Sequence, residues 1–133
     1  MTGKTAFNQE SELDSLLNQL HFLASRSRLN AVVEKQAQSE FESALINSDF
    51  TYEREYRLSD GDIVDFVLQA STGLIAVELK LKAKRMSIFR QLSRYATHEK
   101  VIAVVLLTGT AMNLPPLIKN KPAAVISIGE AWL

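Results

Sequence analysis

Two runs of strand-forming residues on either side of a short turn constrain the fold of this chain more than any other feature. They lie within DIVDFVLQASTGLIAVELKLK, residues 62–82, where the turn is Ser-Thr-Gly. Side chains alternate between the two faces of a strand. One face of the first run therefore carries Val64, Phe66 and Leu68, and one face of the second carries Val77, Leu79 and Leu81. The pattern predicts an antiparallel hairpin whose two apolar sets lie on a common core.

The other face of this hairpin carries charge. A turn centred on residues 71–72, with Gly73 free to adopt a positive φ, fixes the register of the two strands. The facing pairs are then Val64 with Leu79, Asp65 with Glu78, and Phe66 with Val77. Like charges that face each other across two strands destabilise a sheet by up to about 1 kcal/mol on an open surface. The register therefore predicts two carboxylates that need a compensating charge.

A divalent cation would supply that charge, because hard ions such as Mg²⁺ bind carboxylate oxygens and leave positions for water and phosphate. Lys80 follows Glu78 by two residues and lies on the same face, where its ammonium can orient a water or a phosphate oxygen beside the metal. The alternative is an amphipathic hairpin in which Asp65 and Glu78 are surface residues and Lys80 is an ion-pair partner.

Length and composition place few limits on function. The 133 residues suit a single domain, and the absence of cysteine excludes disulfides and thiolate metal sites. No apolar segment is long enough to cross a membrane, and we expect a soluble, cytoplasmic protein. The 15 basic and 15 acidic residues cancel, which argues against a strongly cationic nucleic-acid-binding protein. However, residues 80–100 contain seven basic residues and one acid, so one side of the fold should be basic.

Helical periodicity surrounds the hairpin. A first helix is predicted from Ser11, its N-cap, with apolar residues at Leu13, Leu16, Leu17, Leu20 and Leu23. A second is predicted over residues 30–47, with Val33, Ala37, Phe41, Ala44 and Leu45 facing inward. A third is predicted over residues 87–99, where Ile88, Phe89, Leu92 and Ala96 form an apolar stripe. The fold therefore combines helices with the hairpin.

Three more strands are predicted. Residues 50–58 show the alternating pattern of a strand. VIAVVLLTG from residue 101 is a continuous apolar run typical of a strand covered on both faces, and AAVISIG is the last predicted strand. Residues around Pro115-Pro116 indicate a turn or a short helix. Because the strand at Val101 follows a helical crossover, we expect it to lie parallel to a hairpin strand. The order predicts an α/β domain with a mixed sheet.

The motif Asp65, Glu78-Leu79-Lys80, followed by a helix with Gln91 and Tyr95 in Q-x-x-x-Y spacing, resembles the PD-(D/E)XK nuclease superfamily. This superfamily includes restriction enzymes, Holliday-junction resolvases, recombination exonucleases and virus-type replication and repair nucleases. The resemblance covers about residues 30–109 and implies a restriction-endonuclease-like core of order α-β-β-β-α-β. Residues 1–29 would be a helical extension, and residues 110–133 a C-terminal strand segment. Val64 stands where the superfamily motif has proline.

The resemblance also implies roles for individual residues. Asp65 and Glu78 would bind Mg²⁺ or Mn²⁺, and Lys80 would assist the attacking water. An additional acid is expected from the helix at residues 30–47, and the candidates are Glu34, Glu40 and Glu42. Glu34 is favoured because it shares a helix face with Gln38, Phe41 and Leu45; a solvated helix charge is the alternative.

The third helix would provide substrate contacts. Gln91 and Tyr95 would lie close to the active site, while His98, on the same stripe, is expected at the surface. Five basic residues flank the expected site and are candidates for phosphate contacts, with a solvated charged face as the alternative: Lys82, Lys84, Arg85, Arg90 and Arg94. The zero net charge predicts modest affinity or a groove completed by a second subunit, so a homodimer through the leucine-bearing first helix is expected.

These observations predict a metal-dependent DNA nuclease that hydrolyses phosphodiester bonds, with branched DNA or DNA undergoing repair or recombination as a substrate class. The alternative is a non-catalytic nucleic-acid-binding or assembly module on the same fold. The sequence does not choose between endonuclease and exonuclease action, or between DNA and RNA.

Overall fold

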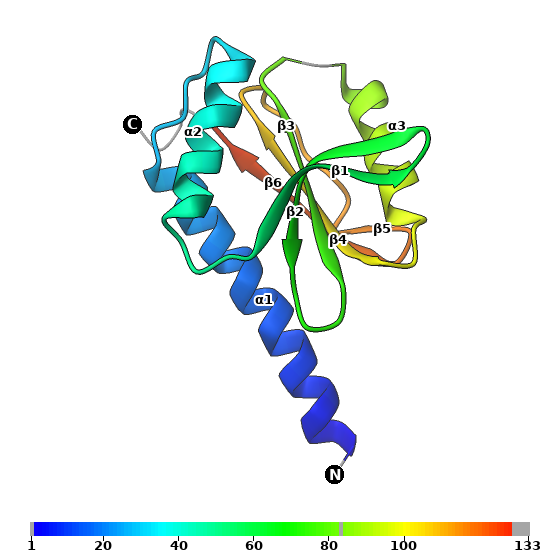
Figure 1. Ribbon diagram of the computed structural model, residues 1–133. Helices are drawn as coiled ribbons and strands as arrows, with labels where there is room; N and C mark the ends of the chain where they lie inside the picture. Colours follow the sequence, from blue (N-terminus) through cyan, green and yellow to red (C-terminus); the bar gives the residue numbers. More distant parts are fainter. Residues whose placement is uncertain (1, 83, 129–133) are drawn as a thin grey trace.

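A computed structural model describes the backbone of residues 2–82 and 84–128, with side chains from residue 12 onward. The elements are α1 (Thr2–Arg26), α2 (Glu34–Ile46), β1 (Tyr52–Ser59), β2 (Asp62–Gln69), β3 (Leu74–Lys80), α3 (Arg85–Ala96), β4 (Val101–Thr108), β5 (Leu117–Ile118) and β6 (Lys121–Ser127). From α2 to β4 the order is α-β-β-β-α-β, as predicted. The chain has a mixed α/β fold (Figure 1).

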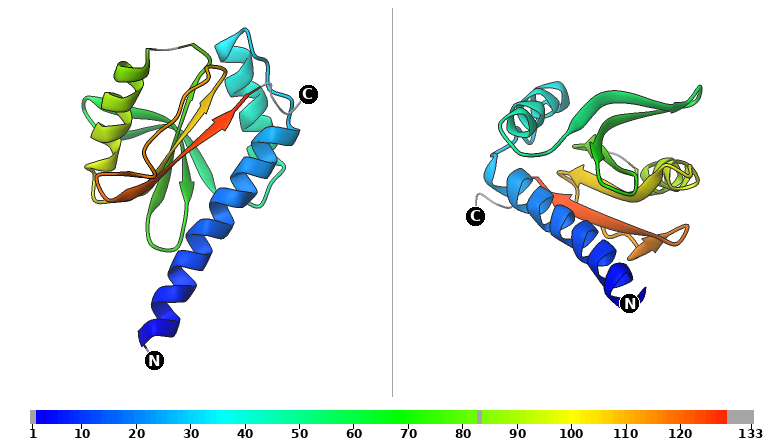
Figure 2. Two further views of the ribbon diagram at one scale, coloured as in Figure 1. Left: turned by 180° about the vertical axis from the view of Figure 1, so that it is seen from behind. Right: turned by 60° about the horizontal axis from the view of Figure 1, so that its bottom comes forward.

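The strands form one sheet in the order β1-β2-β3-β4-β6-β5. β1, β2 and β3 pair antiparallel, whereas β3 with β4 and β4 with β6 pair parallel. The predicted parallel pairing of the strand at Val101 is thereby confirmed. Helices α1 and α2 lie on one face of the sheet and α3 lies on the other (Figure 2).

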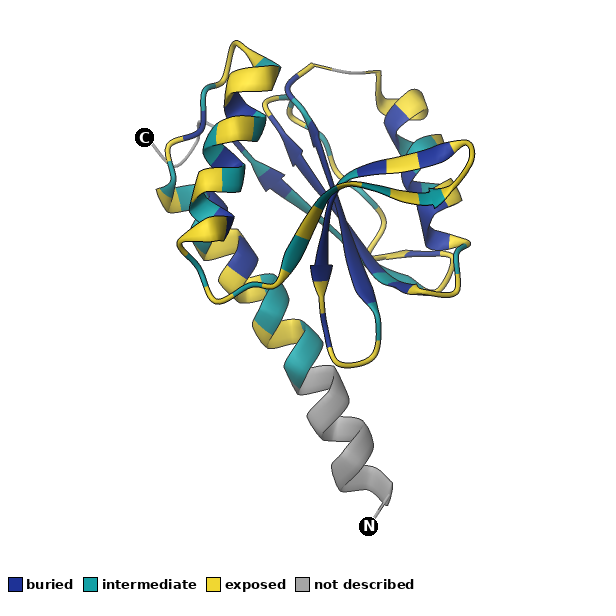
Figure 3. Ribbon diagram, in the orientation of Figure 1, coloured by how far each residue is buried: buried dark blue, intermediate teal, exposed yellow. Residues whose placement is uncertain are grey.

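Each face of the sheet has its own apolar layer. On the α1 and α2 side, the core includes Leu20, Phe41, Phe66, Val77 and Val105. On the α3 side, it includes Val67, Ala76, Leu92, Tyr95 and Leu106. β3 and β4 contribute to both layers and are buried along almost their whole length, as the dark strands in Figure 3 show. This agrees with the continuous apolar run of β4, which was predicted to be covered on both faces.

The β2–β3 hairpin has the predicted register from Phe66 opposite Val77 to Gln69 opposite Leu74. The predicted pairs Asp65–Glu78 and Val64–Leu79 lie beyond the end of this ladder. Gly73 is needed at the turn because a Cβ atom there would lie 2.6 Å from the carbonyl oxygen of Lys100. Close approach of the backbone thus selects this glycine.

One face assignment in the hairpin is wrong. Val64 was predicted to share a face with Phe66 and Leu68, but it is buried in the layer on the α3 side. The neighbouring strand β1 is irregular here, since Glu55 has a φ of 52° and the ladder passes from Arg54–Phe66 to Tyr56–Val64. The twist carries the end of the β1–β2 hairpin toward α3, as Figure 1 shows.

Several predicted boundaries also differ. α1 is continuous from Thr2, so Ser11 lies within the helix and not at its start, and the Ser11 side chain is outside the described residues. α2 begins at Glu34 because the Asn30 side chain accepts hydrogen bonds from the backbone N–H groups of Val32 and Val33. Val33, predicted inward, is therefore outside the helix and 49% exposed.

The remaining differences lie at strand and helix ends. β1 begins at Tyr52, two residues after the predicted start, and α3 spans Arg85–Ala96 instead of residues 87–99. The segment around Pro115-Pro116 forms no helix and leads into the short strand β5. Among the described residues, no helix is both long and apolar enough to cross a membrane.

Candidate active site

Asp65 and Glu78 lie where the β2–β3 ladder ends. Backbone pairing stops at Phe66–Val77, and the two carboxylates bind the backbone groups that the diverging strands leave free. The Asp65 N–H donates to Glu78 Oε1 at 3.1 Å, and the Leu79 N–H donates to Asp65 Oδ2 at 2.8 Å. Each acid is therefore held by the strand of the other, and both side chains belong to the same opening in the sheet.

Each carboxylate retains one oxygen without a hydrogen-bond donor among the described residues. For Asp65 this is Oδ1, and for Glu78 it is Oε2, whose nearest cation is Lys80 Nζ at 3.9 Å. In the described part of the chain no buried side-chain oxygen or nitrogen lacks a hydrogen-bond partner. Both free oxygens must therefore be in contact with solvent, although Glu78 as a whole is only 2% exposed.

Burial without full compensation governs the electrostatics of this pair. Burial raises the pKa of Glu78 to about 7, and the negative charge of Asp65 adds to the shift. Burial likewise raises the pKa of Asp65, against the opposing effects of the Leu79 N–H and Lys80. Desolvation disfavours the ionised form of a carboxyl group, and a second carboxylate nearby disfavours it further. The site thus lacks positive charge.

Glu34 is the helix acid that reaches this opening. As the first residue of α2, it accepts a hydrogen bond from the Leu81 N–H at 3.1 Å, and its charge contributes to the raised pKa of Asp65. The other two candidates are engaged elsewhere. Glu40 accepts from the Asn30 N–H, while Glu42 binds both the Tyr52 hydroxyl and Arg54.

Tyr95 comes to the pair from α3. Its hydroxyl donates to the Ile63 carbonyl oxygen at 3.0 Å and lies 3.4 Å from Glu78 Oε1. Burial raises the pKa of Tyr95, and the Gln91 side chain acts on the same hydroxyl in the opposite direction. Gln91 and Tyr95 are thus near the carboxylates, with Tyr95 in the core and Gln91 half-buried.

The predicted basic residues differ in their surroundings. Lys82, Lys84, Arg85 and Arg90 are exposed. Arg94 is not free, because its Nε lies 3.0 Å from Asp62 Oδ1.

Sequence reasoning missed the cluster that engages Arg94. Asp62, 9% exposed, binds Arg94 with one oxygen and lies 3.1 Å from His98 Nε2 with the other. The His98 hydrogen bond, followed by Arg94, lowers the pKa of Asp62 despite its burial. His98 was expected at the surface, but its side chain is only 25% exposed. The signal was the i, i+4 spacing of Arg94, in the last turn of α3, and His98, just beyond the end of the helix.

Asp65 and Glu78 provide a suitable donor set for a hard divalent cation: two carboxylate oxygens that meet solvent, on a half-buried and a buried group whose pKa values are both raised. Among residues 12–82 and 84–128, no group of three or more acidic or histidine side chains forms a ready metal cluster. The protein would therefore supply two carboxylates, and water or substrate the remaining ligands.

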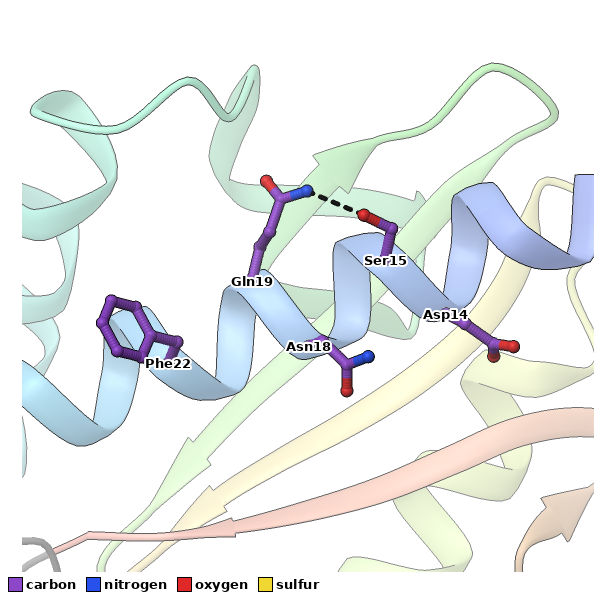
Figure 4. Close-up of a pocket in the computed structure, with 5 residues that line it drawn as sticks. All are labelled: Asp14, Ser15, Asn18, Gln19 and Phe22. Carbon is purple, nitrogen blue, oxygen red and sulfur yellow. Dashed lines mark hydrogen bonds between the residues drawn. The ribbon is translucent and has the colours of Figure 1, made fainter. Parts of the chain in front are cut away.

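A different hollow lies along α1 and is bordered by Asp14, Ser15, Asn18, Gln19 and Phe22. Figure 4 shows these side chains spread along one helix and pointing apart, with a single hydrogen bond from Gln19 to Ser15. No group of side chains converges there. The opening at Asp65 and Glu78 is the better candidate site.

Comparison of the sequence with protein-family profiles and with curated proteins finds no match. Among solved structures, the small subunit (R.BspD6I2) of the heterodimeric restriction endonuclease R.BspD6I is similar, with a TM-score of 0.47 and 10% sequence identity. The similarity covers 68% of this chain and 61% of that subunit. The candidate site is therefore judged on its own geometry.

Proposed function

We propose that this chain is a metal-dependent nuclease of the PD-(D/E)XK type, which hydrolyses phosphodiester bonds in DNA. The observation that carries the proposal is the pair Asp65 and Glu78. Each has one oxygen fixed by a backbone N–H and one oxygen in contact with solvent. A structural role alone would not require a buried Glu78 beside a half-buried Asp65, because desolvation and repulsion both oppose the pair.

In this proposal Asp65 and Glu78 would hold Mg²⁺ or Mn²⁺. The ion, when bound, would supply Lewis acidity and lower the pKa of a water molecule. The Lys80 ammonium, 3.9 Å from Glu78 Oε2 and about one-third exposed, would orient the attacking water or a phosphate oxygen. Glu34 would fix the end of β3 beside the pair through the Leu81 N–H, and Tyr95 with Gln91 would hold Glu78 in place.

The substrate side of the proposal rests on charge. Lys82, Lys84, Arg85 and Arg90 are exposed, and in this proposal they would contact phosphates without reading sequence. Branched DNA and DNA in repair or recombination are the proposed substrates. We also propose a cytoplasmic homodimer in which α1, with Phe22 63% exposed, contributes to the interface. Sedimentation of the purified chain would give its oligomeric state.

One observation favours the rival function, a non-catalytic nucleic-acid-binding or assembly module. Each carboxylate accepts a hydrogen bond from the backbone of the opposing strand. The two bonds satisfy N–H groups that are left free where the ladder ends. The same carboxylates would therefore have a structural purpose without any metal.

A cleavage assay with Mg²⁺ on linear, nicked and branched DNA, with single-stranded RNA as a further substrate, tests the proposal. Mg²⁺-dependent products that disappear with EDTA are expected. Calorimetric titration with Mn²⁺ gives a second result that does not depend on activity, and wild type should bind the ion while Glu78→Gln should not. Absence of both cleavage and metal binding would favour the rival.

A further inference from the structure

A row of polar side chains leads away from the carboxylate pair across the sheet. β3, β4 and β6 run parallel, and their registers set Lys80 beside Thr108 and Thr108 beside Ser127. Residues in register on neighbouring parallel strands point to the same face of a sheet. Thr108 and Ser127 therefore lie on the face that carries Glu78 and Lys80, the face covered by α3.

The row ends at a polar hollow of about 450 Å³. Its lining comes from the first residue of α3, the segment after β4 and the end of β6: Arg85, Ala111, Met112, Asn113 and Ser127. None of the described lining residues is acidic. The hollow thus offers a guanidinium, an amide and a hydroxyl, which are donors suited to an oxyanion.

The walls of this hollow are fixed to the strand that carries the candidate site. The Thr110 hydroxyl donates to the Leu81 carbonyl oxygen at 3.1 Å, and the Thr110 N–H donates to Thr108 Oγ1 at 3.1 Å. A Cβ atom at Gly109 would lie 3.2 Å from the Leu81 carbonyl oxygen, so the segment runs close against the end of β3. These contacts hold the hollow at a fixed position relative to the carboxylate pair.

Arg85 has donors available for a ligand. Its Nη2 donates to the Ala111 carbonyl oxygen at 3.3 Å, a long hydrogen bond that places the guanidinium over the hollow. No other hydrogen bond or ion pair of this side chain exists among the described residues, and Arg85 is exposed. Arg94 differs, since Asp62 already neutralises it. A planar guanidinium with free N–H groups is well suited to bind a phosphate.

We infer that this hollow is a second phosphate subsite, in which Arg85, Asn113 and Ser127 bind a phosphate of the nucleic-acid strand that crosses the site. The inference rests on the proposed function and deepens it by assigning a substrate position. Lys80 and Ser127 are two strand spacings apart, roughly 10 Å. The phosphate bound here is therefore not the one at Asp65 and Glu78. It belongs either to the interior of the strand or to its end.

The test measures DNA binding without metal, so that cleavage plays no part. Fluorescence anisotropy with a short labelled duplex in EDTA compares wild type, Arg85→Ala, Asn113→Ala and the control Lys100→Ala. Lys100 is also exposed and basic but precedes β4, at the opposite edge of the sheet. Arg85→Ala should raise the Kd roughly tenfold, as expected for lost hydrogen bonds to a charged group. Its log–log salt slope should fall by about 0.9.

A scan of the duplex backbone identifies the phosphate. Replacing single phosphates by uncharged methylphosphonates should weaken wild-type binding at one position and leave Arg85→Ala unaffected there. A 5′-phosphorylated and an unphosphorylated duplex separate the two sources of the phosphate. Affinity that depends on the terminal phosphate indicates a strand end. Affinity that depends only on the position of the methylphosphonate indicates an interior phosphate. Either result supports the subsite.

Equal affinities and salt slopes for Arg85→Ala and Lys100→Ala would overturn the inference, as would a wild-type protein that does not bind DNA. The outcome is separable from that of the proposed function. A wild type that cuts DNA while Arg85→Ala binds normally leaves the nuclease proposal intact and removes the subsite. Arg85-dependent binding without any cleavage preserves the subsite and removes the nuclease.

Discussion

Two acids on the same strand, Asp62 and Asp65, have opposite electrostatic environments. Asp62 binds Arg94 at 3.0 Å and His98 at 3.1 Å, and these partners lower its pKa. Asp65, three residues further along β2, lies beside the buried Glu78, and the pKa values of both are raised. Arg94 and Tyr95 are neighbours on α3, so one helix contacts Asp62 directly and, through Tyr95, the Glu78 that lies beside Asp65.

The difference separates a structural ion cluster from a pair of acids whose charge the protein compensates only in part. Around Asp62 the charges cancel within the protein, and the cluster joins the start of β2 to the end of α3. Around Asp65 and Glu78 the protein supplies backbone N–H groups and the Lys80 ammonium at 3.9 Å, which compensate the negative charge only in part. A buried charge without a full partner is unfavourable. Binding a cation would relieve it.

The largest expected effect is on catalysis. Lys80→Ala should reduce the cleavage rate by at least about 100-fold, the contribution typical of a group that positions or transfers a proton. Because Lys80 is one-third exposed and 3.9 Å from Glu78, its loss should change stability by no more than about 0.5 kcal/mol. Cleavage rate, Mn²⁺ titration and melting temperature check this, with Lys100→Ala as the control. A Lys80→Ala protein that cuts at the wild-type rate would contradict it.

The next effect concerns Glu78 and pH. Since the folded pKa of Glu78 is about 7, above its ordinary value of 4.5, the unfolded chain releases this proton first as pH rises. Stability due to this group is therefore full below about pH 4.5 and lost as pH rises through about 7. Glu78→Gln keeps an acceptor for the Asp65 N–H but removes the charge, so at pH 8 it should be more stable by about 2–3 kcal/mol.

Denaturant unfolding in metal-free buffer at pH 5 and pH 8 measures this effect. The difference in stability between Glu78→Gln and wild type should fall to below about 1 kcal/mol at pH 5, and Mg²⁺ at pH 8 should stabilise wild type alone. Glu78→Ala is the matched comparison. It removes the same charge but leaves the Asp65 N–H without its acceptor, so it should be less stable than Glu78→Gln. A Glu78→Gln protein less stable than wild type at pH 8 would indicate a fully compensated carboxylate.

Neutralising Asp62 should change the stability of the protein in the opposite direction. Asp62→Asn removes the charge that binds Arg94 and His98, and it should destabilise the protein by about 1 kcal/mol at neutral pH. Because the folded pKa of Asp62 is lowered, its contribution is present above the ordinary value of 3.8 and lost as pH falls through the folded value. Unfolding at pH 7 and pH 3 checks the sign. A more stable Asp62→Asn protein would remove the contrast between the two acids.

Local patterns predicted much of the fold. The register of β2 with β3 follows from alternation and a short turn, and the parallel β4 follows from a helical crossover. Val64 could not be assigned in this way, because its face depends on the twist that accompanies the left-handed Glu55 in another strand. The start of α2 at Glu34 likewise depends on the Asn30 side chain, whose turn competes with the helix.

The candidate site was predictable in its residues but not in its environment. The spacing in the sequence predicted that Asp65, Glu78 and Lys80 lie together. The carboxylates accept hydrogen bonds from the opposing backbone N–H groups only because the β2–β3 ladder ends at Phe66–Val77. The pairing of Asp62 with Arg94 joins segments distant in sequence, and the residues around Asp62 gave no sign of it. Charge counts could not show which arginines remain free.

The smallest expected effect separates two arginines one helical turn apart on α3. Arg90 is exposed, whereas Arg94 is held by Asp62. Arg90→Ala should weaken DNA binding about threefold and lower the salt slope by about 0.9, the value for one lost phosphate contact. Arg94→Ala should leave the slope nearly unchanged, because a guanidinium already paired with a carboxylate releases few counterions from DNA. It should instead lower the melting temperature, which Arg90→Ala should not do.

Anisotropy titrations at several salt concentrations, with thermal unfolding of the same samples, measure both quantities. Equal slope changes for the two variants would show that DNA draws Arg94 away from Asp62, and that the Asp62 cluster also takes part in binding.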